Sequence, residues 1–332
     1  MNDPVCVGEF KGGGLVLGYA CPSRCRHCLY GCGPHRRDGK PSPDELEHVL
    51  DQLAARAPRA ALHIGGGEPF GDFELLRQAV RGMVERRLHL EYIETNASWV
   101  QDREQAEARL ADLASDGLQC LLISVSPFHA EFVAPGRTLA LIAAANRVLP
   151  GGAFVWIPEL LKEITSQPPS RRLDLERQLS EKGDRWALSL AARYGLVPAG
   201  RAGRYLARHG QLAPYEELVA RAPCRARLTR TSHFHVDGQG RYVPELCAGI
   251  VLPVAMLPGP VDPQDAPVVS CLLTGGLPAL LERARQLGFE PLGRYSAACD
   301  LCTHIRRHLF AVQPSGDLGP EGFYDSRSLP DH

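Results

Sequence analysis

The sequence lacks an excess of charge of either sign, and it lacks a long apolar run. Its 332 residues carry 37 Lys and Arg side chains against 38 Asp and Glu side chains, a formal net charge of −1. This balance provides no electrostatic attraction for nucleic acid or for an anionic membrane. The longest apolar run, 246–257, is interrupted by Pro253 and is shorter than the roughly 18 residues that a membrane-spanning helix needs.

The first residues also lack the basic-then-apolar order of a signal peptide. We therefore expect a cytoplasmic protein that has neither nucleic acid nor membrane as a partner. The length of the chain suggests about two domains, or one large α/β barrel.

A complete set of disulfides is excluded as well, because the chain has 11 cysteines, an odd number. A cytosolic compartment keeps thiols reduced, so closely spaced cysteines there usually bind metal or take part in chemistry. Two groups stand out, at 21–28 and at 299–302, and Cys224 and Cys247 lie between them.

Strand-like and helix-like segments alternate over the first two-thirds of the chain. We expect strands at 14–19, 60–64, 90–94, 121–125, 153–157 and 194–197, and helices at 43–56, 73–87, 102–115, 139–148, 173–181 and 186–192. Five or six strand–helix units with short connections predict a parallel sheet that is covered by helices. The right-handed crossover rule closes such a series into a full or partial barrel, with ligand chemistry at the carboxyl ends of the strands.

This alternation stops after about residue 200. A short helix at 201–209 and a β-hairpin, whose strands at 233–236 and 241–243 flank an Asp-Gly turn, are expected next. A helix near 277–287 follows a Pro-rich loop. The predicted domains are 1–200 for the barrel, 201–223 for a connector, 224–312 for a small β-hairpin-plus-helix domain, and 313–332 for a polar, loosely held tail.

Three cysteines, Cys21, Cys25 and Cys28, lie in the loop directly after the first expected strand. Thiolates hold iron–sulfur clusters, and three of them leave the fourth iron of a cubane cluster open. Short cysteine spacings also build zinc sites, for which Cys32 or His27 could supply the fourth ligand.

Glycines end the second expected strand, in the stretch Gly65-Gly66-Gly67-Glu68-Pro69. Glycine lets the backbone approach a ligand closely, and the proline ends the strand. This stretch comes one βα unit after the cysteine loop, so both should reach the same rim of the barrel.

These features resemble the radical S-adenosylmethionine (SAM) superfamily. The resemblance rests on the CxxxCxxC loop, the Gly-Gly-Glu-Pro stretch and Glu94-Thr95-Asn96 after the third strand, over roughly 14–200. It implies an α/β fold with a partial (β/α)6 TIM-like barrel, a [4Fe–4S] cluster on Cys21, Cys25 and Cys28, and SAM on the fourth iron. The cofactor contacts that it implies come from His27, Gly66, Gly67, Glu68, Pro69, Thr95, Asn96, Ser124 and Ser126.

Within that set, the backbone of 66–69 would hold the SAM ammonium, and His27 would lie near the adenine. The carboxylate or ribose would be bound by Thr95, Asn96, Ser124 and Ser126. The adenine motif Gly-x-Ile-x-Gly-x-x-Glu is not recognisable near 154–157.

The later cysteines resemble the twitch module, a shortened form of the SPASM domain. The set is Cys224, Cys247, Cys299 and Cys302, and the resemblance implies a second, auxiliary [4Fe–4S] cluster. Four thiolates also suit a structural zinc ion, and this alternative stays open. His233 and His235 share one face of a strand and are expected to frame the auxiliary cluster.

The implied activity is reductive cleavage of SAM to a 5′-deoxyadenosyl radical, which abstracts a substrate hydrogen atom. With electron transfer through the auxiliary cluster, the net reaction would oxidise a small molecule. An external electron donor of the flavodoxin or ferredoxin type is the expected partner. Modification of a peptide delivered by a partner is the alternative activity, and a two-cluster electron carrier is the alternative without catalysis.

Overall fold

One eight-stranded sheet runs through the centre of the protein, and the computed structural model describes residues 6–166 and 168–329. The strand order is β10-β9-β8-β2-β3-β4-β5-β6, in which β2 to β6 run parallel and β8 joins β2 in the same direction. The strands are β2 (Gly12–Val16), β3 (Ala61–Gly65), β4 (His89–Thr95), β5 (Leu121–Ser124), β6 (Ala153–Trp156), β8 (Phe234–Asp237), β9 (Arg241–Val243) and β10 (Leu252–Pro253). The fold is therefore mixed α/β, with a central sheet of mostly parallel strands.

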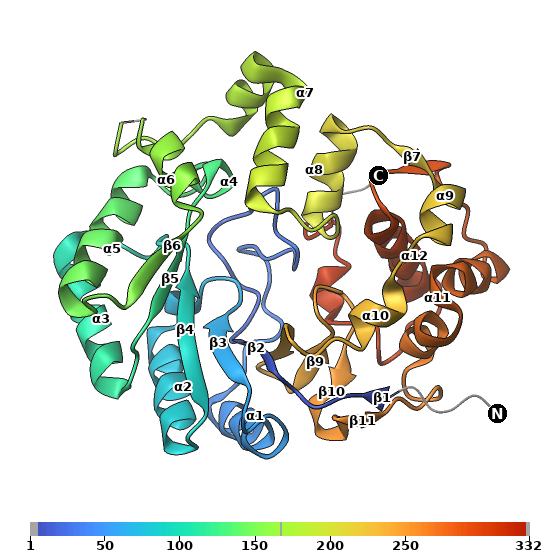
Figure 1. Cartoon of the computed structure of the whole chain (residues 1–332), viewed down its shortest axis with the longest axis horizontal. Coiled ribbons are helices and arrows are strands. Elements are labelled where there is room, and N and C mark those ends of the chain that lie inside the picture. The colour runs from blue at the N-terminus through green and yellow to red at the C-terminus, as the bar shows by residue number, and fades with distance from the viewer. Residues whose placement is uncertain (1–5, 167, 330–332) are drawn as a thin grey trace.

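Helices cover the outer face of the parallel strands, as Figure 1 shows. They are α1 (Pro43–Arg56), α2 (Phe73–Glu85), α3 (Arg103–Asp116) and α5 (Pro135–Val148), with the short segments η1 (Pro69–Gly71), α4 (Pro127–Ala130) and α6 (Pro158–Thr165) between strands and helices. The long loop after β2 lies on the other side of the sheet, near α7 (Leu175–Tyr194) and α8 (Arg201–His209).

The boundaries of α1 illustrate how local sequence sets an element. Ser42 accepts a hydrogen bond from the backbone N–H of Glu45, and the Glu45 carboxylate accepts one from Ser42, a reciprocal cap at the helix start. Pro43 occupies the first helical position, where its missing N–H has no cost. The predicted helices at 43–56 and 201–209 are confirmed, and the strands of the sheet and the helices between them lie within a few residues of their expected positions, apart from one strand. The helices expected at 173–181 and 186–192 form one helix, α7, with a kink at Gly183, and the helix expected near 277–287 begins ten residues earlier, at Pro267.

That strand, expected at 194–197, is wrong. α7 continues through Tyr194, and Gly195 ends it with φ of +72°, a left-handed conformation that glycine adopts at helix ends. The sixth parallel position is taken instead by β8, which pairs with the free edge of β2.

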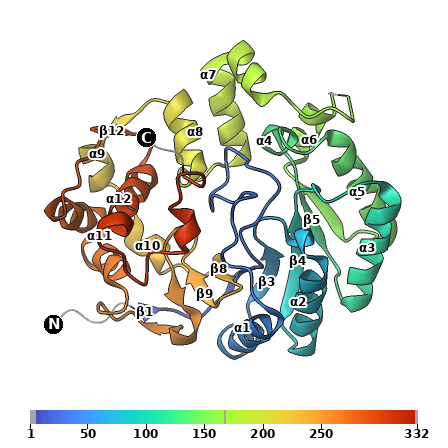
Figure 2. The same cartoon turned by 180° about the vertical axis from the view of Figure 1, so that it is seen from behind.

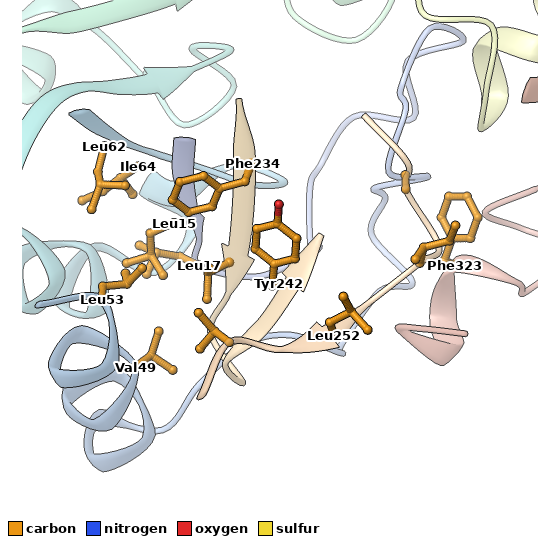
Figure 3. Close-up of a cluster of buried hydrophobic side chains, with 14 of the residues drawn as sticks. Leu15, Leu17, Val49, Leu53, Leu62, Ile64, Phe234, Tyr242, Leu252 and Phe323 are labelled. Carbon is orange, nitrogen blue, oxygen red and sulfur yellow. The ribbon is translucent and has the colours of Figure 1, made fainter. Parts of the chain in front are cut away.

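The hairpin β8–β9 therefore continues the central sheet, whereas we expected it in a separate small domain. Its side chains complete the core of the first half: Phe10 stacks on Phe234 at 4.5 Å and on Tyr242 at 5.2 Å between ring centroids. Figure 3 shows Phe234 and Tyr242 in the same apolar cluster as Leu15 of β2. This shared burial explains why the hairpin joins the sheet.

The rest of the C-terminal half gathers on one side of the central loop, away from α2, α3 and α5 (Figure 2). Its elements are β7 (Ala213–Pro214), α9 (Tyr215–Ala220), α10 (Cys224–Leu228), η2 (Val254–Met256), β11 (Gly259–Pro260), α11 (Pro267–Gln286), β12 (Arg294–Tyr295), α12 (Ala298–Val312) and η3 (Glu321–Phe323). The short β1 (Cys6–Val7) pairs antiparallel with β11, and β7 pairs with β12.

The expectation of a loosely held tail is wrong for 313–329. Phe323 is fully buried, and the ring of Tyr324 stacks on Phe310 of α12 at 4.6 Å. These aromatic side chains bury apolar area against α12, which holds the segment in place. Residues 330–332 lie outside the described part of the chain. Among the described helices, none has both the length and the apolar content to cross a bilayer.

Candidate functional site

A cavity of about 360 Å³ opens at the carboxyl ends of β3, β4 and β5, enclosed by the loop after β2 and the end of α7. Of the residues predicted to bind cofactors, the cavity wall contains Cys21, Cys25, Cys28, His27, Gly66, Gly67, Thr95, Asn96 and Ser124. Glu68, Pro69 and Ser126 do not line it. Parallel strands place their carboxyl ends at one rim, which explains why segments up to 100 residues apart meet here.

Hydrogen bonds from several elements hold the three cysteines of the first loop. The Cys21 sulfur accepts from Asn96 Nδ2 and from the Ser23 N–H, both at 3.4 Å, and the Cys28 sulfur accepts from the Cys32 N–H at 3.3 Å. Burial raises the pKa of Cys21 to about 12, with a further contribution from the Glu68 charge. Such buried, hydrogen-bonded sulfurs are the surroundings in which iron–sulfur clusters are held.

Arg201, at the start of α8, holds the cysteine loop in place through hydrogen bonds. Its Nε donates to the carbonyl of Cys25 at 2.9 Å, and its Nη2 donates to the carbonyl of Cys32 at 2.6 Å. The Arg201 backbone N–H also donates to the carbonyl of Cys28, at 3.2 Å. The sequence reasoning missed this role, because a buried arginine 170 residues away leaves no local pattern in the loop.

The end of β3 approaches the cysteine loop closely. A Cβ at Gly67 would lie 2.0 Å from the carbonyl oxygen of Ala20, and the Gly67 N–H donates to Gly18 at 2.8 Å. Gly66 adopts a φ of +135°, which a side chain disfavours. The glycines therefore serve here to pack two backbones together, and both line the cavity.

Glu68 lies behind the wall and connects β3 to β4. Its carboxylate accepts hydrogen bonds from the hydroxyl of Thr95 at 2.8 Å, the N–H of Asn96 at 2.9 Å and the N–H of Phe70 at 3.3 Å. Burial raises the pKa of Glu68 to about 7. Pro69, which begins η1, is buried beside it. Both residues position the rim of the cavity.

The four residues predicted to bind the SAM carboxylate or ribose fall into two kinds. The Thr95 hydroxyl donates to Glu68 and accepts from the indole N–H of Trp99 at 2.9 Å, so it is engaged within the protein. The Ser126 hydroxyl contacts His129 Nδ1 at 2.9 Å. Asn96 and Ser124 face the cavity, and Ser124 donates to Glu94 at 2.6 Å. Burial raises the pKa of Glu94, whose carboxyl also lines the cavity.

His27 belongs to a buried aromatic group beside Cys25. Its ring centroid lies 4.5 Å from that of Tyr194, 4.7 Å from that of His129 and 5.0 Å from that of Phe128. Its Nδ1 has no hydrogen-bond partner among the described residues. Burial lowers the pKa of His27 and of His129, so both imidazoles are neutral near pH 7.

A histidine cluster forms another wall of the cavity, and it includes His233 and His235, which were expected to frame the auxiliary cluster. Because β8 pairs with β2, both histidines face the cavity beside His63 of β3. The Nε2 atoms of His235 and His63 lie 3.3 Å apart, and the Tyr30 hydroxyl lies 2.8 Å from His235 Nδ1. The period-two spacing of His233 and His235 was the available signal, but the strand's pairing partner was unknown.

The second cysteine set also comes together. Cys224 begins α10, Cys247 follows β9, and Cys299 and Cys302 lie in the first turns of α12. Burial raises the pKa of Cys224 to about 12, and the charges of Cys302 and Cys299 raise it further. Burial and the same two neighbours raise the pKa of Cys247. The four thiols are therefore near enough to influence one another, and four thiolates are a full ligand set for one metal centre.

The distances between the sulfur atoms of each cysteine set indicate which kind of metal centre the set can hold. In the described part of the chain, Cys25, His27 and His129 form the only group of three or more ligand atoms that all lie within 4.8 Å of one another. Around a tetrahedral zinc ion with bonds of about 2.3 Å, sulfurs lie about 3.8 Å apart. Neither cysteine set is this compact, and a cluster with several irons holds its ligands further apart.

Comparisons with solved structures give only distant similarity. BtrN in complex with AdoMet and 2-DOIA is 13% identical with a TM-score of 0.38, covering 89% of this chain and 92% of BtrN. Streptococcus suis SuiB bound to S-adenosylmethionine is 13% identical with a TM-score of 0.41, covering 94% and 74%. TM-scores below 0.5 at such identities carry no argument about substrate or reaction.

The sequence comparisons are more specific. No curated protein matches the sequence significantly. Residues 15–149 match the Radical SAM superfamily, and this segment contains the CxxxCxxC loop, the glycine-rich end of β3 and the ends of β4 and β5. Residues 15–149 of this chain are therefore similar to the Radical SAM superfamily.

Proposed function

We propose that this protein is a radical SAM oxidoreductase that oxidises a small molecule with the help of an auxiliary [4Fe–4S] cluster. One observation carries the proposal: the three thiols of the CxxxCxxC loop, the glycine-rich end of β3 and the polar ends of β4 and β5 line one cavity. A radical SAM domain implies a [4Fe–4S] cluster and SAM, and this cavity contains the residue types that both require.

In this proposal Cys21, Cys25 and Cys28 hold the cluster, and Asn96 fixes one of the ligands through its 3.4 Å contact to Cys21. When bound, the cluster and SAM supply a 5′-deoxyadenosyl radical that abstracts a hydrogen atom from the substrate. The protein orients the substrate and excludes water, because such a radical reacts with any C–H bond it meets. Gly66 and Gly67 would offer backbone groups to the SAM ammonium, and His27 would lie beside the adenine.

The substrate is proposed to be small because the space is limited. The cavity volume of about 360 Å³ is near the lower end of the range for small-molecule sites, about 300–1,000 Å³. SAM must share this space. The remaining wall offers the imidazoles of His63, His233 and His235, which burial keeps neutral by lowering their pKa values. Both ring nitrogens of His235 already contact other side chains, Tyr30 and His63. The neutral imidazole of His233 can accept a hydrogen bond from a hydroxyl or amino group, so a polar small molecule suits this wall.

The second cysteine set is proposed to hold the auxiliary cluster. Its sulfurs are spread more widely than around a zinc ion, which favours an iron–sulfur cluster. Four protein ligands leave no iron open, so such a cluster transfers electrons and does not bind substrate. An external flavodoxin- or ferredoxin-type donor is proposed to reduce the first cluster.

The proposal is tested with anaerobically reconstituted full-length protein, SAM and dithionite. We expect 5′-deoxyadenosine in wild type and none in a variant in which Cys21, Cys25 and Cys28 are alanine. Iron analysis is expected to give about eight atoms per chain for two [4Fe–4S] clusters. Absence of 5′-deoxyadenosine from the wild-type reaction would reject the enzyme, and about four irons with one zinc would reject the auxiliary cluster.

A further inference from the structure

A buried cation lies within the second cysteine set without a carboxylate partner. Arg306 of α12 is 3% exposed, and none of the carboxylates in the described residues pairs with it. Its Nη1 donates to the carbonyl of Ala248 at 2.9 Å and to the hydroxyl of Tyr324 at 3.1 Å, and its Nη2 donates to Thr303 at 3.3 Å. Its Nε has no hydrogen-bond partner. A buried guanidinium without a counter-charge is strongly unfavourable, so an anion must stand beside it.

The acidic groups that act on Arg306 are the phenol of Tyr324 and the thiols of Cys302 and Cys247. Cys302 precedes Arg306 by four residues, so both side chains lie on one face of α12. Burial lowers the pKa of the Arg306 guanidinium, but the charges of Tyr324, Cys302 and Cys247 raise it by more. Cysteines bind metals as thiolates, so a loaded site would supply this guanidinium with a counter-charge.

The backbone is shaped to seat this guanidinium. Gly249 has a φ of +87°, and a Cβ there would lie 2.6 Å from Nη1 of Arg306 and 2.4 Å from the ring of Phe323. Phe323 and Tyr324 of the C-terminal segment close the site, and Tyr324 donates to the carbonyl of Gly249. The charge is therefore held at a fixed place and shielded from water, where electrostatic effects are strong.

A second cation contacts the same set from another element. Nη1 of Arg227, on α10, lies 3.5 Å from the Cys299 sulfur. Arg227 is partly exposed, so its charge is screened more than that of Arg306.

We propose that Arg306, assisted by Arg227, sets the reduction potential of the cluster held by Cys224, Cys247, Cys299 and Cys302. This inference rests on the auxiliary cluster proposed above. A cluster gains one negative charge when it takes up one electron, so a fixed positive charge beside its ligands stabilises the reduced form more than the oxidised form. Net charge, hydrogen bonds to sulfur and solvent exposure are the factors that set such potentials. The two arginines thus make the cluster a better electron acceptor.

The test is an EPR-monitored redox titration of the reconstituted full-length protein. Arg306→Gln is expected to lower the equilibrium constant for one-electron reduction of the auxiliary cluster at least tenfold. This change corresponds to a reduction potential that is 59 mV lower. Arg306→Lys keeps the charge and is expected to restore most of the potential, and Arg227→Gln should lower it less than Arg306→Gln. Arg225→Gln, an exposed arginine on the same helix, should change nothing. The cluster in the first site, measured in the same sample, should keep its potential.

Equal auxiliary-cluster potentials in wild type and Arg306→Gln would overturn the inference and leave the proposed function standing. About four irons in wild type would show instead that no second cluster forms, and would overturn both. If Arg306→Gln does not assemble the second cluster, Arg227→Gln decides the matter: a lowered potential supports the inference, and an unchanged one overturns it.

Discussion

The two cysteine sets of this protein are surrounded by different kinds of side chain. Around Cys21, Cys25 and Cys28 the wall of an open cavity presents amide, hydroxyl and imidazole groups. Beside the later set lies the fixed charge of Arg306, against which Phe323 and Tyr324 of the C-terminal segment pack. The first arrangement leaves room for molecules to enter, whereas the second places a fixed, buried positive charge beside four partly buried thiols. Metal ligands alone do not reveal this division of roles, because cysteines supply both sets.

The ligand counts match this difference. Three cysteines can leave one iron of a cubane cluster open, and the neighbouring cavity provides space for what binds there. Four cysteines would complete a cluster and leave none of its irons open, as the proposed electron-transfer role requires. The comparison therefore predicts that substitutions in one region leave the other region's readout intact.

The largest effect is expected from Cys25→Ala, which should abolish formation of 5′-deoxyadenosine. Two thiolates cannot retain the SAM-binding cluster, but the second set should still load about four irons. Iron analysis and chromatography of the SAM reaction measure both quantities. Cys120→Ala, which changes a half-buried cysteine outside both sets, is the matched control and should behave as wild type. Loss of all iron from Cys25→Ala would mean that the two sites are not independent.

The converse substitution, Cys302→Ala, should remove about half of the iron and leave cleavage of SAM by dithionite-reduced protein in place. The reason is that the auxiliary cluster loses a ligand while the first loop is untouched. Cys271→Ala is the control, since Cys271 lies on α11 and its charged neighbour is Arg283, not the four thiols. A loss of iron in Cys271→Ala would instead identify that residue as an auxiliary ligand.

Sequence reasoning predicted the residues of both sets but not their surroundings. The cap of α1 and the cysteine spacing are local features, readable within a few residues. The pairing of β8 with β2 joins segments about 220 residues apart, and no local pattern specifies a partner at that distance. For this reason the hairpin was assigned to a separate domain, and His235 was not expected beside His63.

The buried arginines were missed for a related reason. Arg201 and Arg306 look like ordinary helix-surface residues in the sequence, because arginine is mostly exposed in proteins. Only the fold shows that each is buried against a cysteine-bearing segment. The tail was misjudged because its prolines and glycines suggested disorder, whereas two aromatic side chains anchor it.

A smaller effect is expected from truncating Phe323, which packs against Arg306 beside the second cysteine set. Phe323→Ala should destabilise the protein by about 3–5 kcal/mol, because the fully buried ring leaves a cavity against Arg306 and Gly249. Chemical denaturation of the reconstituted protein measures this loss, and oxygen exposure should bleach the auxiliary cluster faster than in wild type. Val312→Ala, at an exposed position at the end of α12, should stay within about 0.5 kcal/mol of wild type. Equal stability of Phe323→Ala and Val312→Ala would show that the segment does not cover the site.

The smallest effect concerns the histidine wall, which has no counterpart at the second site. Burial lowers the pKa of His63 to about 4, and the charge of His233 lowers it further. The native state therefore holds this imidazole neutral, while the unfolded state protonates it below its ordinary pKa of about 6.5. Between these values the unfolded state binds more protons, so wild type loses stability as pH falls from about 6.5 towards 4.

His63→Gln removes this proton uptake, and its stability should fall less than that of wild type on acidification. Between pH 7.5 and 5.5 the difference in the change of unfolding free energy should be about 1 kcal/mol. Anaerobic urea titrations at the two pH values measure it, with His48→Gln, an exposed histidine of α1, as the control that should follow wild type. A His63→Gln profile that also follows wild type would mean that the imidazole is already accessible to protons in the native cavity. Water would then reach this wall, contrary to the proposal that the first cavity excludes water from its substrate.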